Sequence, residues 1–299
     1  MLMRSSFFLP GSDIDWVKRS PDMGCDLLGL DIEDGVAKSA KEQARKNIRE
    51  NLKHAGSKGA SVFVRINGWT TGMANHDLES VVYEGLHGIV LPKTEGADQV
   101  KRLDWRLGEL EAARGLEPGS VKIMMLIETA KGVMEVYESC KASPRNVACI
   151  FGVVDYALDM KIPYDEDEGI GIEYGRQVVP VACRATGLIA IDQPFMRVGD
   201  RYTEKFAASC RKGASMGYEG RMLCDICQVE PSNNIYGPSS ADVEWAHKAI
   251  KIFEEEGLAK GHGEVFLDGV FYDIPVWRSA KQILAKWDEI QAHAAFLKK

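Results

Sequence analysis

Eight short runs of apolar and β-branched residues recur along this chain, separated by stretches in which apolar residues repeat at helical spacing. Strands that alternate with helices pair in parallel, because each helix carries the chain back to the start of the next strand. Eight such units favour a closed TIM (β/α)8 barrel of the α/β class over an open sheet, and 299 residues are enough for one. The expected strands are residues 6–9, 27–33, 61–67, 88–93, 122–129, 147–155, 188–195 and 218–225.

The stretch between the second and third runs shows how a helix start is encoded. Ser39 and Glu42 have the spacing of a capping box, in which each side chain bonds the backbone of the other. Ala44, Ile48 and Leu52 then recur every four residues, which gives a helix one apolar face.

The residues after the eighth unit exceed what a barrel needs. We expect the barrel to occupy residues 1–260 and a C-terminal extension to occupy residues 261–299, with a hairpin that turns at Asp268-Gly269 and a helix from Pro275. The extension is too aromatic for a free tail, so we expect it to pack on the barrel or on another subunit. Its aromatic residues include Phe271, Tyr272, Trp277 and Trp287.

The net charge of −7, with no basic stripe, disfavours a nucleic-acid-binding protein. The apolar run Phe7–Leu9 is cut off by Pro10 and is far too short for a signal peptide or a membrane span, so we expect a cytoplasmic protein without a membrane partner. Seven cysteines is an odd number, and most lie in apolar segments, which disfavours a disulfide framework.

In a barrel of this kind the side chains at the carboxyl ends of the strands line the active site. Carboxylates that converge there repel one another unless a cation offsets them. No histidine occurs at a strand end, so oxygen ligands favour Mg²⁺, or Mn²⁺, with Glu128 and Asp155 as the protein carboxylates. The candidates at strand ends are Glu33, Asp34, Arg65, Asn67, Lys93, Glu128, Asp155, Asp192 and Asp225.

Several of these candidates also have purely structural interpretations. An acid after a strand is commonly a helix N-cap or a turn former, and Asp34 and Asp192 fit that role. Arg65 lies in an apolar strand and forms either a structural ion pair or part of the catalytic site. Glu128 follows four apolar residues, where an ionised carboxylate is costly unless it is paired.

Cys224 and Cys227, in the stretch LCDICQ, have the spacing of a zinc knuckle or a redox pair. A structural zinc site needs four ligands, and no second pair stands at partner spacing, which disfavours zinc. A redox pair usually opens a helix after a strand in a smaller fold, so that interpretation is weak.

Eight motifs taken in order resemble the citrate lyase β-subunit-like (HpcH/HpaI aldolase) family, and within it the malyl-CoA, β-methylmalyl-CoA and citramalyl-CoA lyases. Each motif alone is weak, but their common order over nearly the whole chain is specific. They are RSSFFLPG (4–11), LDIEDGV (30–36), VRING (64–68), LPK (91–93), IETAKG (127–132), GVVDYA (152–157), IDQPF (191–195) and GYEGR (217–221), followed by the tail GHGEVFLDGVFYDIP (261–275).

The resemblance implies a TIM barrel that cleaves or forms 3-hydroxyacyl-CoA thioesters by a reversible Claisen reaction, giving an acyl-CoA and a 2-oxoacid. It implies that Glu128 and Asp155 hold Mg²⁺ and that Glu33 and Asp34 lie nearby. Arg65 is then expected to hold the developing oxyanion charge, which agrees with the need for preorganised positive groups around an enolate.

The resemblance also assigns a proton-transferring acid to the tail of a neighbouring subunit, and the matching residue is Asp273. It therefore implies a homotrimer or hexamer. Asp273 precedes Pro275 and is equally placed to be a helix N-cap, and the two roles are compatible. Arg4 and Lys93 are weaker candidates for contacts with coenzyme A or substrate.

The chain departs from the family pattern after the eighth strand. Relatives commonly have Gly-Lys and then Ile-His-Pro-x-Gln, whereas this chain has Arg221 for the lysine and Asp225 in the place of the histidine. Arg221 can still meet an anion, as a planar fork instead of a point charge, and Asp225 adds negative charge near the expected substrate.

Three other functions use much of the same sequence. A malyl-CoA-type thioesterase shares nearly all of the expected site. A catalytically silent protein that binds coenzyme A or a 2-oxoacid is compatible with the altered residues around Asp225. A free 2-oxoacid aldolase is disfavoured, because the tail with Asp273 resembles that of the CoA lyases.

Overall fold

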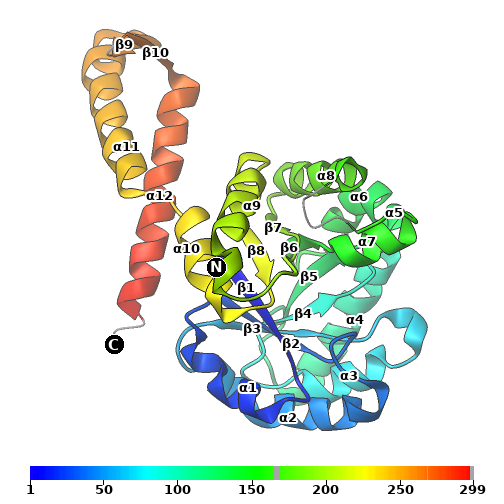
Figure 1. The fold of residues 1–299 in the computed structure, drawn as a ribbon. Coiled ribbons are helices and arrows are strands. Elements are labelled where there is room, and N and C mark those ends of the chain that lie inside the picture. The colour runs from blue at the N-terminus through cyan, green and yellow to red at the C-terminus, as the bar shows by residue number, and fades with distance from the viewer. Residues whose placement is uncertain (165–168, 268, 297–299) are drawn as a thin grey trace. The chain divides into compact units, whose positions relative to one another are not determined.

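The computed structural model describes residues 1–164, 169–267 and 269–296, and eight of its strands close into one parallel barrel (Figure 1). The strands follow the order of the chain, and β1 pairs with both β2 and β8 to close the ring. The expected (β/α)8 barrel is therefore confirmed. Its strands are β1 Ser5–Pro10, β2 Leu27–Asp31, β3 Ser61–Arg65, β4 Gly88–Leu91, β5 Lys122–Ile127, β6 Asn146–Phe151, β7 Ile189–Asp192 and β8 Gly220–Leu223.

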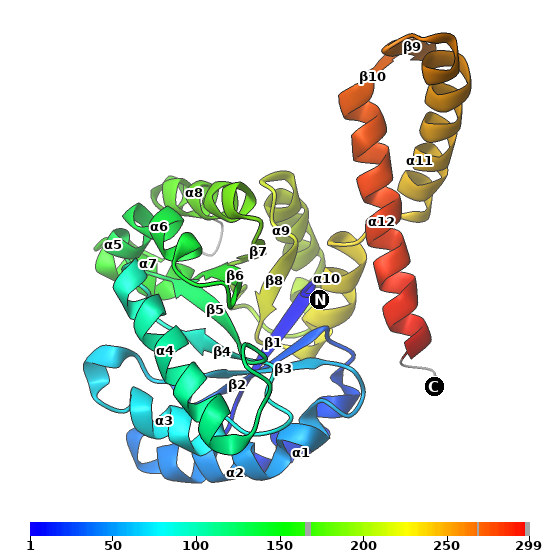
Figure 2. The same ribbon diagram turned by 180° about the vertical axis from the view of Figure 1, so that it is seen from behind.

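Helices surround this ring of strands on the outside, as the two opposite views show (Figures 1 and 2). Each strand from β1 to β7 is followed by one or more helices that lead to the next strand of the barrel. The helices around the barrel are α1 Ile14–Arg19, α2 Lys41–Ala55, α3 Ala74–Val81, α4 Ala97–Arg114, α5 Ala130–Met134, α6 Val136–Lys141, α7 Val153–Asp159, α8 Ile170–Thr186, α9 Thr203–Ser215 and α10 Val229–Ile235.

The barrel interior is filled by apolar side chains from alternate positions on the strands. Met124 and Leu126 of β5 and Ala148 and Ile150 of β6 belong to one buried cluster. Successive residues of a strand point to opposite faces, so Cys149 points outward to the helices. The centre of the barrel is therefore a packed core, and space for a ligand is left at the ends of the strands.

The strands end earlier than the sequence analysis expects. The strand β6 ends at Phe151, and Gly152 is then the N-cap of α7, so Asp155 lies in the first turn of a helix. A Cβ atom on Gly152 would lie 2.6 Å from the Cβ atom of Glu128, which explains why the close turn here contains glycine. Asp155 is thus positioned by a helix start and not by a strand.

The capping box expected at Ser39 and Glu42 is wrong. A short 3-10 turn contains Ser39, and α2 begins only at Lys41, with no side-chain cap. The Lys41 ammonium instead donates to the carbonyl oxygens of Ile32 and Glu33, at 2.7 and 2.9 Å. The start of α2 therefore holds the segment that follows β2.

A second compact unit consists of Leu2 and Asn234–Lys299, and the first consists of Met1 and Met3–Asn233. The division lies earlier than the expected boundary at residue 260, because α11 (Ser240–Ile252) packs on α12 (Ile274–Phe296). Small side chains allow this close packing, and Ala246, Ala249 and Ala280 are buried between the helices.

The expected hairpin is present within the second unit. β9 (Glu264–Leu267) and β10 (Val270–Asp273) pair antiparallel and join one end of α11 to one end of α12 (Figures 1 and 2). The turn residue Asp268 lies outside the described residues. The rings of Phe266 and Phe271 contact each other, with centroids 5.4 Å apart, and both residues are exposed, so the hairpin presents an apolar surface.

In the described part of the chain, no helix is both long enough and apolar enough to cross a lipid bilayer.

Candidate active site at the mouth of the barrel

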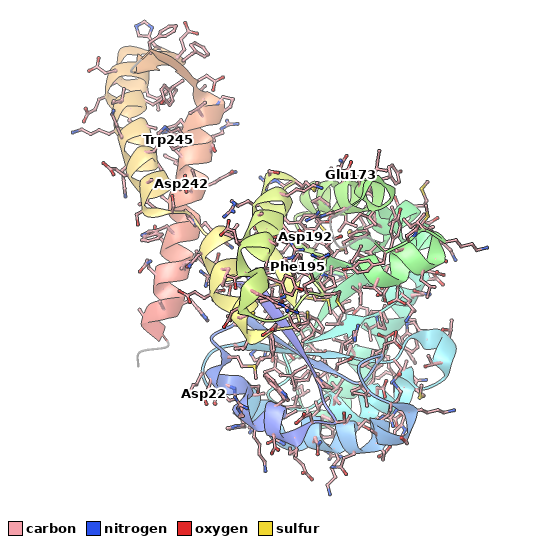
Figure 3. All side chains as sticks on the ribbon, in the orientation of Figure 1. Asp22, Glu173, Asp192, Phe195, Asp242 and Trp245 are labelled. Carbon is pink, nitrogen blue, oxygen red and sulfur yellow. The ribbon has the colours of Figure 1, made fainter. Side chains whose placement is uncertain are left out.

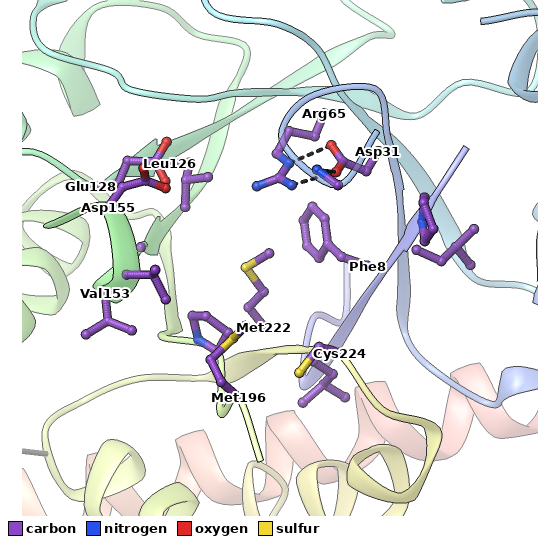
Figure 4. Close-up of a pocket in the computed structure, with 17 residues that line it drawn as sticks. Phe8, Asp31, Arg65, Leu126, Glu128, Val153, Asp155, Met196, Met222 and Cys224 are labelled. Atoms are coloured by element: carbon purple, nitrogen blue, oxygen red, sulfur yellow. Dashed lines mark hydrogen bonds and ion pairs between the residues drawn. The ribbon is translucent and has the colours of Figure 1, made fainter. Parts of the chain in front are cut away.

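A cavity of about 310 Å³ opens at the carboxyl ends of the barrel strands. Apolar side chains form most of its wall, among them Phe8, Leu126, Val153, Met196 and Met222. Figure 4 shows the polar groups above this wall, with Glu128 and Asp155 on one side and Arg65 bonded to Asp31 on the other. The cavity thus combines an apolar floor with opposed charges.

Arg65, the last residue of β3, is held by the last residue of β2. Its Nε and Nη2 atoms donate to the two carboxylate oxygens of Asp31 at 2.7 and 2.6 Å, and its Nη1 atom lies 3.3 Å from Glu33 Oε2. Burial alone would lower the pKa of Arg65, but these carboxylates outweigh burial and raise it. The guanidinium is therefore a fixed positive charge on the cavity wall.

Asp31 is a site residue that the sequence analysis missed. Its carboxylate also accepts from the backbone N–H groups of Glu33 and Gly35, both at 2.8 Å. A Cβ atom on Gly35 would approach Asp31 to 2.4 Å, so glycine is required for this contact. An acid at the end of one buried strand, in register with an arginine at the end of the next, was the available signal.

Lys93 lies among the acids at the opening of the cavity. Its ammonium donates to Glu33 at 2.7 Å and Asp34 at 3.0 Å and lies 4.0 Å from Asp155, and its backbone N–H donates to Glu128 at 2.8 Å. Burial opposes the charged form, but the hydrogen bonds to the carboxylates raise the pKa of Lys93. Lys93 therefore lies beside four carboxyl groups, three of them at its ammonium and one at its backbone N–H.

Glu128 has the most perturbed carboxyl group of the mouth. It is 2% exposed, and its burial, followed by the charges of Glu33 and Asp155, raises its pKa to about 8. Burial also raises the pKa of Glu33. The mouth brings together more carboxyl groups than cations, so it has an excess of negative charge. The acids are Asp31, Glu33, Asp34, Glu128 and Asp155, and the cations are Arg65 and Lys93.

Arg4 does not reach this mouth. It immediately precedes β1, at the opposite end of the barrel from the cavity. Its guanidinium donates to both carboxylate oxygens of Asp26 at 2.8 Å and to the carbonyl oxygen of Asn233 at 3.3 Å. This corrects its assignment as a substrate contact: Arg4 is a structural ion-pair partner at the amino end of the strands.

Arg221 is also displaced from the cavity, although it lies on a barrel strand. It is fully buried, 3.4 Å from Asp192, and its guanidinium packs over the rings of Phe195 and Phe206. Asp192 pairs with Arg176 of α8 at 2.6 Å. Figure 3 shows Asp192 and Phe195 on the side of the barrel that α8 and α9 cover. Arg221 therefore belongs to an ion-pair network between strands and helices, which corrects its assignment to substrate.

Asp225 is occupied by backbone contacts. Its carboxylate accepts from the N–H groups of Gly199 at 2.7 Å and Cys227 at 3.2 Å, and it forms a capping box with Gln228. The Asp225 carboxylate, which was expected near the substrate, therefore connects the loop that contains Gly199 to the loop that contains Cys227.

The thiols beside Asp225 have none of the features of a reactive pair. Burial, aided by the charge of Asp225, raises the pKa of Cys224 to about 11, and burial also raises the pKa of Cys227. Thiolates are the reactive species, so neither thiol is activated. Among the described residues, the one group of three or more His, Cys, Asp or Glu side chains with mutual metal-ligand spacing contains neither cysteine.

Asp273 lies in the second compact unit, at the end of β10. Its Oδ1 atom accepts from the N–H group of Val276, 3.2 Å away in the first turn of α12. The expected N-cap role is therefore confirmed, and the catalytic role stays a prediction.

Comparisons with known proteins place this chain in a family. The family model described as HpcH/HpaI aldolase/citrate lyase matches residues 4–225. The chain belongs to this family. The citrate lyase subunit beta of Leuconostoc mesenteroides is 30% identical over 283 residues, covering 95% of this chain and 92% of that protein. The (3S)-malyl-CoA thioesterase of Cereibacter sphaeroides is 30% identical over 292 residues, covering 98% and 97%.

Solved structures of citrate lyase proteins have the same fold. A citrate lyase from Burkholderia xenovorans LB400 superposes with a TM-score of 0.84 at 17% identity, covering 97% of this chain and 93% of that one. CitE from Mycobacterium tuberculosis, in complex with magnesium, acetoacetate and coenzyme A, has a TM-score of 0.75 at 22% identity, covering 94% and 97%.

The raised pKa of Glu128 predicts how stability depends on pH in buffer with a chelator. In the unfolded chain the pKa of Glu128 has the ordinary glutamate value of 4.5, whereas in the folded protein it is about 8. The contribution of protonated Glu128 to the free energy of unfolding is therefore fully present below pH 4.5 and is lost as the pH rises to about 8. Glu128→Gln removes this loss, so its advantage over wild type should grow with pH to the order of 4 kcal/mol.

Urea unfolding at pH 5, 7 and 9, followed by circular dichroism, measures this difference. Glu138→Gln, which changes an exposed acid on α6, is the matched control and should follow wild type. If the unfolding free energies of wild type and Glu128→Gln changed with pH in parallel, the raised pKa of Glu128 would be contradicted.

Proposed function

We propose that this protein is a Mg²⁺-dependent carbon-carbon lyase of the citrate lyase β-like family. It cleaves or forms a 3-hydroxyacyl-CoA thioester, such as malyl-CoA, β-methylmalyl-CoA or citramalyl-CoA, by a reversible Claisen reaction. The observation that carries the proposal is the excess of carboxylates at the mouth, set above an apolar cavity and opposite the fixed charge of Arg65.

Glu128 and Asp155 are the residues that would hold the Mg²⁺ ion, and Mn²⁺ suits the same oxygen donors. The donor set fits such an ion: the mouth has surplus negative charge, burial and then the neighbouring carboxylates raise the pKa of Glu128, and the described residues that line the cavity include no histidine. A bound divalent ion polarises oxygen atoms of a 2-oxoacid and offsets charge that develops on them. The M. tuberculosis protein solved with magnesium and coenzyme A supports this assignment.

Arg65 stabilises the charge that develops on the enolate of the acyl-CoA. Its bidentate contact with Asp31 fixes the guanidinium before substrate binds, so little reorganisation is needed as charge appears. The apolar wall formed by Phe8, Met196 and Met222 limits water around the enolate. Glu33 and Asp34, held by Lys93, orient the remaining polar groups of the mouth.

Asp273 exchanges a proton with the acyl carbon, from the C-terminal extension of a neighbouring subunit. The exposed pair Phe266 and Phe271 on the same hairpin supports a docking role for this segment, because exposed aromatic pairs mark contact surfaces. This proposal implies a homotrimer or hexamer.

A second candidate is the hydrolysis of malyl-CoA or a related thioester. A curated relative named (3S)-malyl-CoA thioesterase is as similar to this chain as the citrate lyase subunit is. Water then attacks the thioester in a site that uses the same charged residues. A catalytically silent protein that binds coenzyme A or a 2-oxoacid is the third alternative.

Incubation of the purified protein with malyl-CoA and Mg²⁺ separates these functions. Glyoxylate and acetyl-CoA are the expected products of cleavage, whereas free malate would favour the thioesterase. Glu128→Ala and Asp155→Ala should each lower turnover roughly 100-fold or more, because each removes a charged group that acts in the transition state. Glu204→Ala, at an exposed acid on α9, is the control.

Full turnover in both Glu128→Ala and Asp155→Ala would contradict the proposal that these two residues hold the Mg²⁺ ion. If malyl-, β-methylmalyl-, citramalyl- and citryl-CoA all give no product while coenzyme A still binds, the protein is a binding protein.

Asp273→Asn tests the acid without disturbing the helix start, because asparagine caps a helix as well as aspartate does. We expect unchanged thermal unfolding and a large loss of turnover. If Asp273 acts on a neighbouring subunit, mixing unfolded Asp273→Asn and Glu128→Ala chains and refolding them together should restore partial activity. Full activity of Asp273→Asn alone would reduce this residue to a helix cap.

A further inference from the structure

Three buried thiols meet on the outer side of β6, apart from the cavity. Cys149 points outward from the strand, Cys140 lies in the last turn of α6, and Cys183 lies in the last turn of α8. Their exposed fractions are 3% or less. The three Sγ atoms lie within 4.8 Å of one another, and those of Cys140 and Cys149 are 3.5 Å apart. In both views α6 lies beside α8 (Figures 1 and 2), and these helices are in contact.

The spacing of the sulfur atoms suits a single central ion. An ion that bonds three sulfur atoms at about 2.3 Å, the usual zinc-sulfur distance, holds them about 4 Å apart. The sulfur separations in this cluster, 3.5 Å between Cys140 and Cys149 and no more than 4.8 Å between any two, lie on either side of that value. Thiolates select soft, thiophilic ions over the oxygen-seeking ions of the barrel mouth.

Hydrogen bonds link the three groups before any ion binds. Those with Cys149 and Cys183 lower the pKa of Cys140, while the bond with Cys140, together with burial, raises the pKa of Cys149 and of Cys183. The causes of these shifts are the thiols, their burial and the hydroxyl of Thr186. A thiolate left without a counter-charge here is costly, because the surroundings are buried.

Charge balance then selects the valence of the ion. Each thiol that becomes a ligand loses one proton, so a monovalent ion on three thiolates leaves two negative charges and a divalent ion leaves one. To offset the negative charge left on either complex, a counter-charge would have to be buried as well, and this costs desolvation free energy. A trivalent ion replaces all three protons and leaves a neutral complex.

We propose that Cys140, Cys149 and Cys183 form a binding site for a trivalent thiophilic ion of the arsenite class. Arsenous acid, As(OH)₃, exchanges its three hydroxyl groups for three thiolates. Three As–S bonds form, three As–O bonds break, and each thiol proton leaves with one hydroxyl group as water. No atom is oxidised or reduced, and the product carries no charge.

The site is separate from the proposed function. Cys149 faces the helices, whereas the cavity lies beyond Gly152 at the end of the same strand. An ion at this position cross-links α6, β6 and α8, so we expect it to raise the thermal unfolding temperature. Uptake should be slower than reaction of the more accessible Cys224 and Cys227, because the cluster must open first.

The test uses the full chain with Cys224→Ser and Cys227→Ser, which removes the other closely spaced pair. Arsenite and methylarsonous acid are the two probes, since the methylated acid has only two exchangeable hydroxyl groups. Arsenic retained after desalting is measured by mass spectrometry. We expect one arsenic per chain with arsenite, and its loss in Cys140→Ala, Cys149→Ala and Cys183→Ala taken singly.

Each single variant keeps two thiols of the cluster and should therefore retain methylarsonous acid, which shows that the variant still folds around the remaining pair. Cys210→Ala, at a buried cysteine outside the cluster, should retain arsenite. Absence of arsenite binding to the parent protein, or equal binding by all three variants, would overturn the proposal. Binding of the methylated probe alone would also overturn it, because two thiols would then suffice.

Discussion

The ion pair between Asp31 and Arg65 connects the parts from which the mouth of the barrel is built. It joins the ends of β2 and β3, which are paired in register, and Asp31 also holds the backbone of Glu33 and Gly35. This fixes the loop that brings Glu33 to Lys93. Without the pair, a largely buried arginine and a buried carboxylate would each lack this partner, so its loss would cost far more than one surface ion pair.

The sequence was sufficient to predict the barrel, because alternation of apolar runs with helical stretches has few other solutions. It was less informative about where each strand stops. Asp155 is predicted at a strand end, yet Gly152 ends β6 early and places Asp155 in the first turn of α7. Its approach to Glu128 still follows, since both elements open onto the same mouth.

The direction in which a side chain points was the second feature that the sequence analysis did not predict. Asp192 and Arg221 are near strand ends but face the helices, because the neighbouring Ile191 packs into the barrel core and Met222 lines the cavity. Strict alternation along β7 and β8 could have shown this. Asp31 was missed because the second strand was expected to continue to Glu33. The actual last residue of this strand, Asp31, was therefore interpreted as part of the core. The Asp225 contact with Gly199 joins loops far apart in sequence, and no local pattern encodes it.

The proposed chemistry requires that the surplus carboxylates of the mouth hold a divalent cation. Crystals grown or soaked with Mn²⁺ and measured at a wavelength where manganese scatters anomalously test this claim without any assumption about substrate. We expect an anomalous difference peak between Glu128 and Asp155, within bonding distance of both carboxylates. A mouth without a peak at saturating Mn²⁺, or a peak held by other residues, would contradict it.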